Sequence, residues 1–165
     1  MGTPDLVLYE EEFQKIKEAL QRLRLDANAN VVFLVDKNGQ QIAATGDLNS
    51  LDTTSLASLT AGNVAATDGL ARLIGEKEFS ILFHEGEKDN IHISIVAQRV
   101  ILVVIFDERS SLGLVRLRVR RATAELDKIF EEITQKVERE KDSAIDFESP
   151  FSEITDDDID RLFSE

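Results

Sequence analysis

The stretch from Asp52 to Gly75 predicts a helix with two different faces. Its leucines recur at helical intervals when Asn63 and Ala66 are counted between them, and we expect this leucine stripe to pack on a sheet. The stripe consists of Leu56, Leu59, Leu70 and Leu73. A neighbouring stripe on the same spacing carries only small residues, namely Ser55, Ser58, Gly62, Ala65 and Gly69.

The small stripe predicts a docking face. Each glycine inside a helix costs roughly 0.5–1 kcal/mol relative to alanine, which makes sense where another backbone comes close. A second interpretation remains open, in which the small residues only let the helix lie tightly on its own sheet. We favour docking because the leucine stripe already provides a core face.

The chain before this helix predicts a helix and a hairpin. Apolar residues at helical spacing indicate a first helix, and Asp26–Asn30 ends it. The apolar positions are Tyr9, Phe13, Ile16, Leu20 and Leu23. Val31–Val35 then predicts a strand, Asn38-Gly39 a primed turn, and Gln40–Thr45 the returning strand.

Three more strands follow the central helix. Alternating residues in 79–84 and 91–96 predict a hairpin centred near Lys88, with Phe83 opposite Ile93 and Ile81 opposite Ile95. The apolar run 100–106 predicts a central strand that is covered on both faces.

The final long helix is predicted from Leu112 to Val137, where apolar residues keep helical spacing. It contains the basic run 116–121, which is either a solvated face or an electrostatic contact for a partner or for the acidic tail. We therefore expect one domain over residues 1–139.

Residues 140–165 are predicted to form an acidic flexible linker and a terminal recognition helix. From 138 onward the chain holds eleven acids and three bases, so this end carries −8 of the net charge of −13. An amphipathic pattern returns at the very end, in Phe151, Ile154, Ile159, Leu162 and Phe163. So short a segment is marginal as an isolated helix, and we expect it to fold on a partner. Alternatively, it packs on its own domain.

Composition excludes several classes of protein. The chain lacks cysteine, so it has no disulfide or zinc–thiolate site. Its acidity disfavours nucleic acid and anionic membranes as partners. We find neither a signal peptide pattern nor a membrane span, which favours the cytoplasm.

The search for catalytic chemistry is mostly negative. Phosphate-loop, dinucleotide, zinc-protease and serine-hydrolase motifs are missing from the sequence. His84 and His92 could face each other across their hairpin, but a third ligand is not evident and we predict no metal or cofactor. Arg109, which precedes a helix, is the one candidate for an arginine finger supplied to a nucleotide hydrolase.

The order helix-strand-strand-helix-strand-strand-strand-helix resembles the Roadblock domain. Sequence segments similar to those of bacterial polarity regulators of this family occur in residues 31–40, 52–66, 83–86, 100–122 and 149–165. The resemblance implies an α+β, profilin-like sandwich: a five-stranded antiparallel sheet with the central helix on one face and the terminal helices on the other.

The resemblance also implies a function without an active site of its own. Such regulators are homodimers that activate a Ras-like small GTPase by re-setting its own catalytic residues, two chains per GTPase, in the cytoplasm and at a cell pole. Dimers pair their third strands and set their central helices side by side. The positions that match the helix seam and GTPase contact are Ala61, Gly62, Ala65, Asp68, Gly69 and Arg72. The terminal helix would dock on the GTPase and aid nucleotide exchange.

Two other classes of function stay open. A Roadblock scaffold would bind a partner without changing hydrolysis, and it has no evident need for the terminal motif. An enzyme or metal protein would use His84 and His92 and would contain metal when purified.

Overall fold

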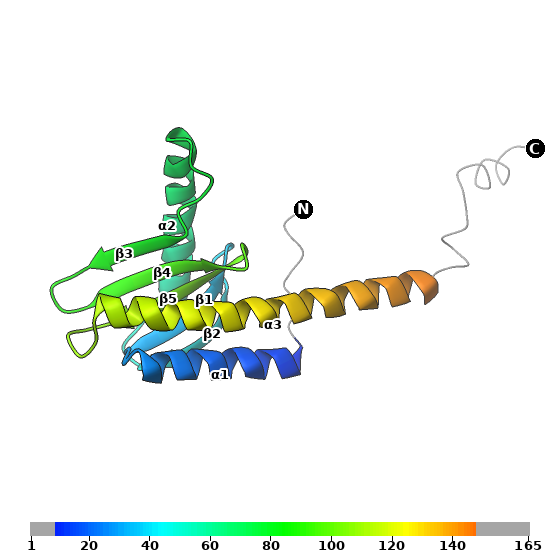
Figure 1. The fold of residues 1–165 in the computed structure, drawn as a ribbon, viewed down its shortest axis with the longest axis horizontal. Helices are drawn as coiled ribbons and strands as arrows, with labels where there is room; N and C mark the ends of the chain where they lie inside the picture. The colour runs from blue at the N-terminus through cyan, green and yellow to red at the C-terminus, as the bar shows by residue number, and fades with distance from the viewer. Residues whose placement is uncertain (1–8, 148–165) are drawn as a thin grey trace, which may run out of the picture.

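The computed structural model describes residues 9–147, which form an α+β sandwich (Figure 1). In chain order the elements are α1 (Glu10–Asp26), β1 (Val31–Asp36), β2 (Gln41–Gly46), α2 (Thr53–Leu73), β3 (Ile81–Glu85), β4 (Asn90–Val96), β5 (Val100–Phe106) and α3 (Leu112–Phe147). The predicted order of elements and the predicted fold class are confirmed.

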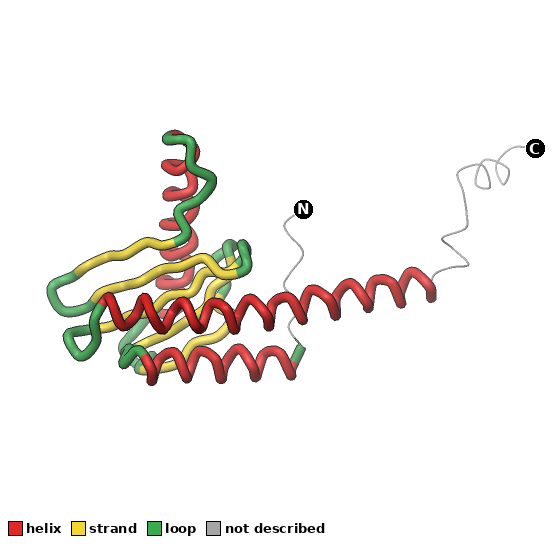
Figure 2. Tube along the Cα trace, in the orientation of Figure 1, coloured by secondary structure: helices red, strands yellow, loops and turns green. Residues whose placement is uncertain are grey.

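The five strands form one antiparallel sheet in the order β2-β1-β5-β4-β3. Every residue of β5 is buried, because the strand lies at the centre of the sheet and both its faces are covered, as its apolar run predicts. Figure 2 shows α1 and α3 side by side on one face of the sheet and α2 on the other.

The larger core lies between the sheet and the pair α1 and α3. It includes the fully buried Leu20, Phe106, Leu126 and Phe130, and Phe83 stacks on Phe106 with ring centroids 6.2 Å apart. Ion pairs tie the two helices together at the rim, including Lys15–Glu132 at 3.0 Å.

The hairpin of β3 and β4 differs from the prediction by one residue. Leu82 pairs with Ile93 and Phe83 with His92, because the Gly86 N–H donates to the Asp89 carbonyl and closes a tighter turn. A shift of one residue moves each side chain to the other face of a sheet. Phe83 therefore lies on the α1 and α3 side instead of facing Ile93.

The turn between β1 and β2 is also not the predicted primed turn. Only Gly39 has a positive φ, of 92°, and Asn38 does not. The Asp36 carboxylate explains the difference, because its Oδ1 accepts the backbone N–H of Asn38 and of Gln40, each at 2.9 Å.

The ends of α2 agree with the predicted stretch from Asp52 to Gly75. Asp52 caps the helix, since its Oδ1 accepts the Ser55 N–H at 3.1 Å. Gly75 ends it with φ at 81°, and the Glu76 N–H donates to the Ala71 carbonyl at 2.8 Å.

The third helix continues beyond the predicted start of the linker at residue 140. It reaches Phe147, and its second half runs past the end of the sheet (Figure 1). The predicted terminal recognition helix, residues 151–163, lies outside the described residues.

Candidate partner-binding surface

Helix α2 lies on the sheet through small side chains, so the prediction that its leucine stripe forms the core face is wrong. The buried residues of the helix are Ala57, Thr60, Ala61, Val64 and Ala71. Close approach explains this choice: a Cβ added at Gly39 would lie 3.3 Å from the Cα of Ser58 and 3.7 Å from the Cβ of Ala61. A leucine on this side would hold the helix away from the strands.

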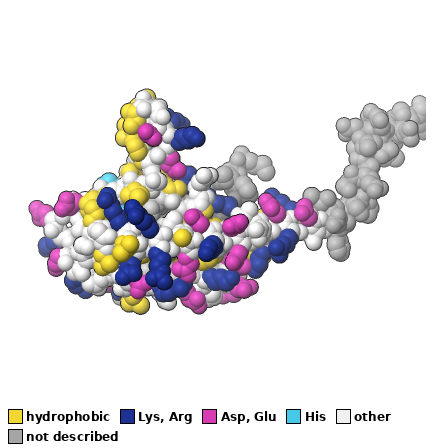
Figure 3. All heavy atoms as spheres, in the orientation of Figure 1, with side chains coloured by type: hydrophobic (Ala, Val, Ile, Leu, Met, Phe, Trp, Pro, Cys, Tyr) yellow, Lys and Arg dark blue, Asp and Glu magenta, His cyan; other side chains and the backbone are white. Residues whose placement is uncertain are grey.

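The leucines point into solvent instead. Leu59 is 72% exposed, Leu70 59% and Leu73 83%, whereas Leu56 is partly buried. Ile74, just after the helix, is 68% exposed. In Figure 3 hydrophobic side chains cover one side of the end of α2 that extends beyond the sheet. Exposed apolar side chains gathered on one element are typical of a binding site.

The small stripe is exposed along its whole length, next to these leucines. Ser55, Ser58, Gly62, Ala65 and Gly69 are all exposed. A Cβ added at Gly62 or Gly69 would meet nothing within 4 Å outside the backbone of its own helix. Another backbone therefore has room to come close to α2 here.

The sequence-predicted contact residues fall into two groups. Gly62, Ala65, Gly69 and Arg72 are exposed, and Arg72 forms no ion pair within residues 9–147. Ala61 is only 9% exposed and belongs to the core beneath α2, so its direct role is to position the helix.

Asp68 is intermediate in exposure between these two groups. It is partly buried, and its Oδ1 has no hydrogen-bond partner within the described residues. We define the α2 surface as the exposed set: Leu59, Gly62, Ala65, Gly69, Leu70, Arg72 and Leu73. Sequence reasoning placed the three leucines of this set in the core.

Strand β3 forms an open edge of the sheet. It pairs with β4 on one side, and no other described strand pairs with its outer side. Ile81 at its start is 49% exposed. An unpaired edge presents backbone N–H and C=O groups to any strand that can align with it.

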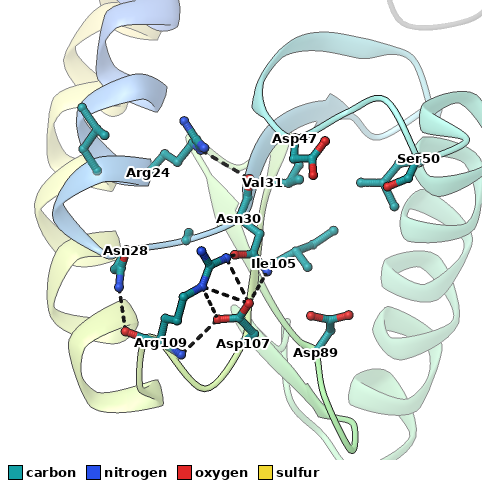
Figure 4. A pocket seen from close by; sticks show the side chains of 13 residues that line it. Arg24, Asn28, Asn30, Val31, Asp47, Ser50, Asp89, Ile105, Asp107 and Arg109 are labelled. Atoms are coloured by element: carbon teal, nitrogen blue, oxygen red, sulfur yellow. Dashed lines mark hydrogen bonds and ion pairs between the residues drawn. The ribbon is translucent and has the colours of Figure 1, made fainter.

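Arg109 is held by hydrogen bonds to its own loop and to the segment before β1, so it is not free to act as an arginine finger. Its Nε donates to Asp107 Oδ1 at 3.0 Å and its Nη2 to Asp107 Oδ2 at 3.0 Å (Figure 4). Nη2 also donates to Asn30 Oδ1, and Asn28 Nδ2 donates to the Arg109 carbonyl at 2.7 Å. Hydrogen bonds from Arg109 hold the pKa of Asp107 well below its usual range.

This network fills one side of a polar pocket where β1 begins and β5 ends (Figure 4). Asp47 and Asp89 also line the pocket. All the contacts of Arg109 lie within the domain, so the network joins the chain after β5 to the chain before β1.

The two histidines do not face each other as their hairpin pattern suggested. His84 pairs with Ile91 and its Nε2 lies 2.9 Å from Asn63 Nδ2 of α2, whereas His92 lies buried on the α3 side. The sheet separates them, and residues 9–147 contain no group of three or more potential metal ligands. The hypothesis of a metal bound by this pair is therefore wrong.

Among the described helices, none has the length and apolar character needed to cross a bilayer.

Comparison with known proteins identifies the fold and its family. The family model described as the Roadblock/LC7 domain matches residues 15–106. A solved structure of Myxococcus xanthus MglB is 65% identical, with a TM-score of 0.74, and the match covers 78% of this chain and 96% of that one. The chain belongs to the Roadblock/LC7 family. Within it, the chain resembles MglB, which confirms the resemblance seen in the sequence.

Other solved structures in this family agree. The gliding protein MglB from Thermus thermophilus is 34% identical with a TM-score of 0.73, and the match covers 79% of this chain and 99% of that one. A structure described as MglB with a tetrameric arrangement is 34% identical with a TM-score of 0.74, covering 80% and 99%. No curated protein matched the chain.

Proposed function

We propose that this Roadblock protein is a dimeric regulator that activates GTP hydrolysis by a Ras-like small GTPase of the MglA type. The α2 surface carries the proposal, because it combines exposed leucines with an open stripe of small residues. The likeness to MglB adds support, since the sequence resemblance implies this partner. Localisation of the protein at a cell pole is part of the same proposal.

The physical argument rests on the cost of leaving leucines exposed. Burying a leucine side chain is worth about 1.5–3 kcal/mol, and Leu59, Leu70 and Leu73 do not gain this within residues 9–147. A partner that covers the α2 surface would gain it. The neighbouring glycines would let a second helix or a switch segment approach the α2 backbone.

A second copy of the chain fits the open edge beside this surface. In the proposed homodimer, the β3 strands of two chains pair edge to edge, which satisfies their free backbone groups. The two α2 helices then lie next to each other and present one combined surface to a single GTPase. A tetrameric arrangement, as described for one MglB structure, would need a further contact.

Activation would not use an arginine finger from this chain. An arginine supplied to the active site is worth on the order of 10³–10⁵ in rate, but Arg109 is bound to Asp107 and Asn30. We infer that the α2 surface holds the GTPase's own catalytic groups in place, which supplies part of the same transition-state stabilisation. The chemistry would then belong entirely to the partner.

The terminal segment would add a second attachment. Phe151, Ile154, Ile159, Leu162 and Phe163 would form a helix that docks elsewhere on the GTPase, and tethering would raise its effective concentration. A role in nucleotide exchange belongs to the same proposal. The division into a domain over 1–139 and a separate functional tail is part of the same proposal, although α3 itself continues to Phe147.

Single-turnover GTP hydrolysis by an MglA-type GTPase tests the proposal. The full chain should accelerate hydrolysis, and Ala65→Arg with Gly69→Arg should abolish the acceleration, because two long cationic side chains would occupy the open stripe. The matched control is Ala124→Arg with Gly113→Arg, which adds the same charge at exposed positions of α3. This control should accelerate hydrolysis like the unchanged chain.

Two outcomes would contradict the proposal. If the full chain binds the GTPase in its GTP form but leaves hydrolysis unchanged, the protein is a scaffold and not an activator. If both arginine pairs retain activation, the contact lies away from α2. A chain truncated after Phe147, where α3 ends, separates the tail, since retained activation would make the tail accessory.

A further inference from the structure

A pocket of about 350 Å³ lies between α3 and the strands β3 and β4, on the sheet face opposite α2. Its apolar walls are the side chains of Ile81 and Val119. Pockets that bind small molecules have volumes of roughly 300–1,000 Å³, so this one is large enough for a compact ligand. The proposed GTPase contact does not involve this pocket.

Two polar side chains in the pocket have no partner. His92 is 0% exposed, and neither of its ring nitrogens forms a hydrogen bond within the described residues. Ser94 is 4% exposed, and its hydroxyl is also unpartnered. A buried polar group without a partner costs about 1–3 kcal/mol, so a pair of them along one pocket requires an explanation.

The chemistry of this pair limits what can satisfy it. Burial lowers the pKa of His92, and the neighbouring Arg116 lowers it further, so the imidazole is neutral near pH 7. A neutral imidazole offers one donor and one acceptor, and the Ser94 hydroxyl offers both. A ligand hydroxyl, which also donates and accepts, is the simplest group that complements them.

The opening of the pocket is basic. Arg116 and Arg120 line it from α3, both are exposed, and neither forms an ion pair within residues 9–147. On the face that carries the first half of α3, Figure 3 shows lysine and arginine side chains next to hydrophobic ones. In a chain with a net charge of −13, such a local positive site favours an anion.

We propose that this pocket binds a small amphiphilic hydroxy acid, whose hydroxyl reaches His92 and Ser94, whose apolar body contacts Ile81 and Val119, and whose carboxylate pairs with Arg116 and Arg120. The basic run of α3 then has a ligand of its own, which neither of its sequence-based interpretations included.

Imidazole NMR of the full chain tests the site directly, with phloretate as the probe. Phloretate has a phenolic hydroxyl at one end and a carboxylate at the other. The chain has only two histidines, and His84 lies on the opposite sheet face as an internal control. Phloretate should shift the His92 ring resonances in a saturable manner and leave those of His84 unchanged.

Two ligands separate the polar contributions. Hydrocinnamate lacks the hydroxyl and should bind about tenfold more weakly, because His92 and Ser94 remain unpaired. Tyramine keeps the hydroxyl but carries a positive charge, and it should not bind.

A matched pair of variants tests the opening. Arg116→Gln with Arg120→Gln should weaken phloretate binding by about fivefold, which is the effect expected for two solvent-exposed charge contacts. Arg121→Gln with Lys128→Gln removes the same charge from exposed positions of α3 that do not line the pocket, and it should bind phloretate normally.

Three results would overturn the assignment. Unchanged His92 resonances at saturating phloretate would mean that the pocket excludes this ligand class. Equal affinity for phloretate and hydrocinnamate would remove the role of the buried pair. Equal weakening by both glutamine pairs would show that only the net charge matters. None of these measurements uses the GTPase, so their failure leaves the proposed activation untouched.

Discussion

The two faces of the sheet are covered in opposite ways. Among the described residues, the core on the α1 and α3 side holds 21 buried residues, including the large Phe106, Leu126 and Phe130. On the α2 side it holds 10, and α2 contributes only Ala57, Ala61 and Val64 to that cluster. Most of the apolar burial that stabilises the domain therefore lies on the α1 and α3 side.

The difference supports the proposed binding role of the α2 leucines. On α1 the large apolar residues face the sheet, as Ile16 and Leu20 do, both 0% exposed. On α2 the large residues face away, and the small ones face the sheet. Stability of the single chain cannot explain this arrangement, because the exposed leucines contribute little to it. Burial of these leucines against the proposed partner would explain the arrangement.

Truncating one large side chain on each side should give the largest difference in unfolding free energy between the two faces. Phe130→Ala should cost about 3–5 kcal/mol of unfolding free energy, because it leaves a cavity in the larger core. Leu73→Ala, at an 83% exposed position, should stay within about 0.5 kcal/mol. Urea unfolding at low protein concentration measures both.

The contrast between the two faces is contradicted if both variants lose the same unfolding free energy. A large loss for Leu73→Ala that persists on dilution would mean that this leucine is buried in the free chain. A loss that grows with protein concentration would instead show that self-association covers it, which agrees with the proposed dimer.

The sequence predicted all eight elements within residues 9–147 because their signals are local. Strand β5 is identified by an uninterrupted apolar run, and α1 by apolar residues such as Phe13 and Ile16 at helical spacing. Asp52 and Gly75 mark the ends of α2 through hydrogen bonds that each residue makes within a few positions.

The orientation of α2 was not predictable from the same signals. The stripe that joins Leu59 to Leu70 passes through Asn63 and Ala66, and period alone does not say which face meets the sheet. Packing decides it, because the close approach of α2 to the turn at Gly39 admits only small side chains. The hydropathy pattern indicates a two-faced helix, and only the tertiary structure assigns the faces.

The predicted register between β3 and β4 was wrong for a different reason. Phe83 and Leu82 are both apolar, so either could face the larger core, and a one-residue change in the turn exchanges them. The same shift placed His92 on the α3 side, beside Arg116. The pocket around His92 was therefore hidden from sequence reasoning, although both residues had been noted.

The α1 and α3 side should also be the more sensitive to acid near neutrality. The folded-state pKa of His92 is lowered, so below the unfolded value of about 6.5 the unfolded chain binds a proton that the folded chain does not. Stability should fall as pH decreases from 6.5 toward the folded pKa, by at most about 1.4 kcal/mol per pH unit for one proton.

Urea unfolding between pH 7.5 and 5 measures this dependence. His92→Phe should remove most of the slope in that window, whereas His84→Phe, on the other face of the sheet, should leave it. If His92→Phe retains the full slope, another group is responsible and the buried imidazole is already paired in solution.

The smallest effect concerns how the helices on the two sides begin. Asp52 accepts the N–H of Ser55 at 3.1 Å and its hydroxyl at 2.6 Å, and no residue in the first turn of α2 is fully buried. Asp52→Ala should speed hydrogen exchange of the first amides of α2 by about fivefold. Ser111→Ala, at the start of α3, should change exchange less, because the buried Val115 also holds that turn.

The same cap should depend on pH. Hydrogen bonds from Ser55 lower the pKa of Asp52, so the stabilisation by this cap is present above the usual pKa of 3.8 and is lost as the pH falls below that value. Acidifying the unchanged chain should therefore reproduce the Asp52→Ala exchange pattern in α2. Equal effects of the two substitutions would show that packing, and not the cap, fixes both helix starts.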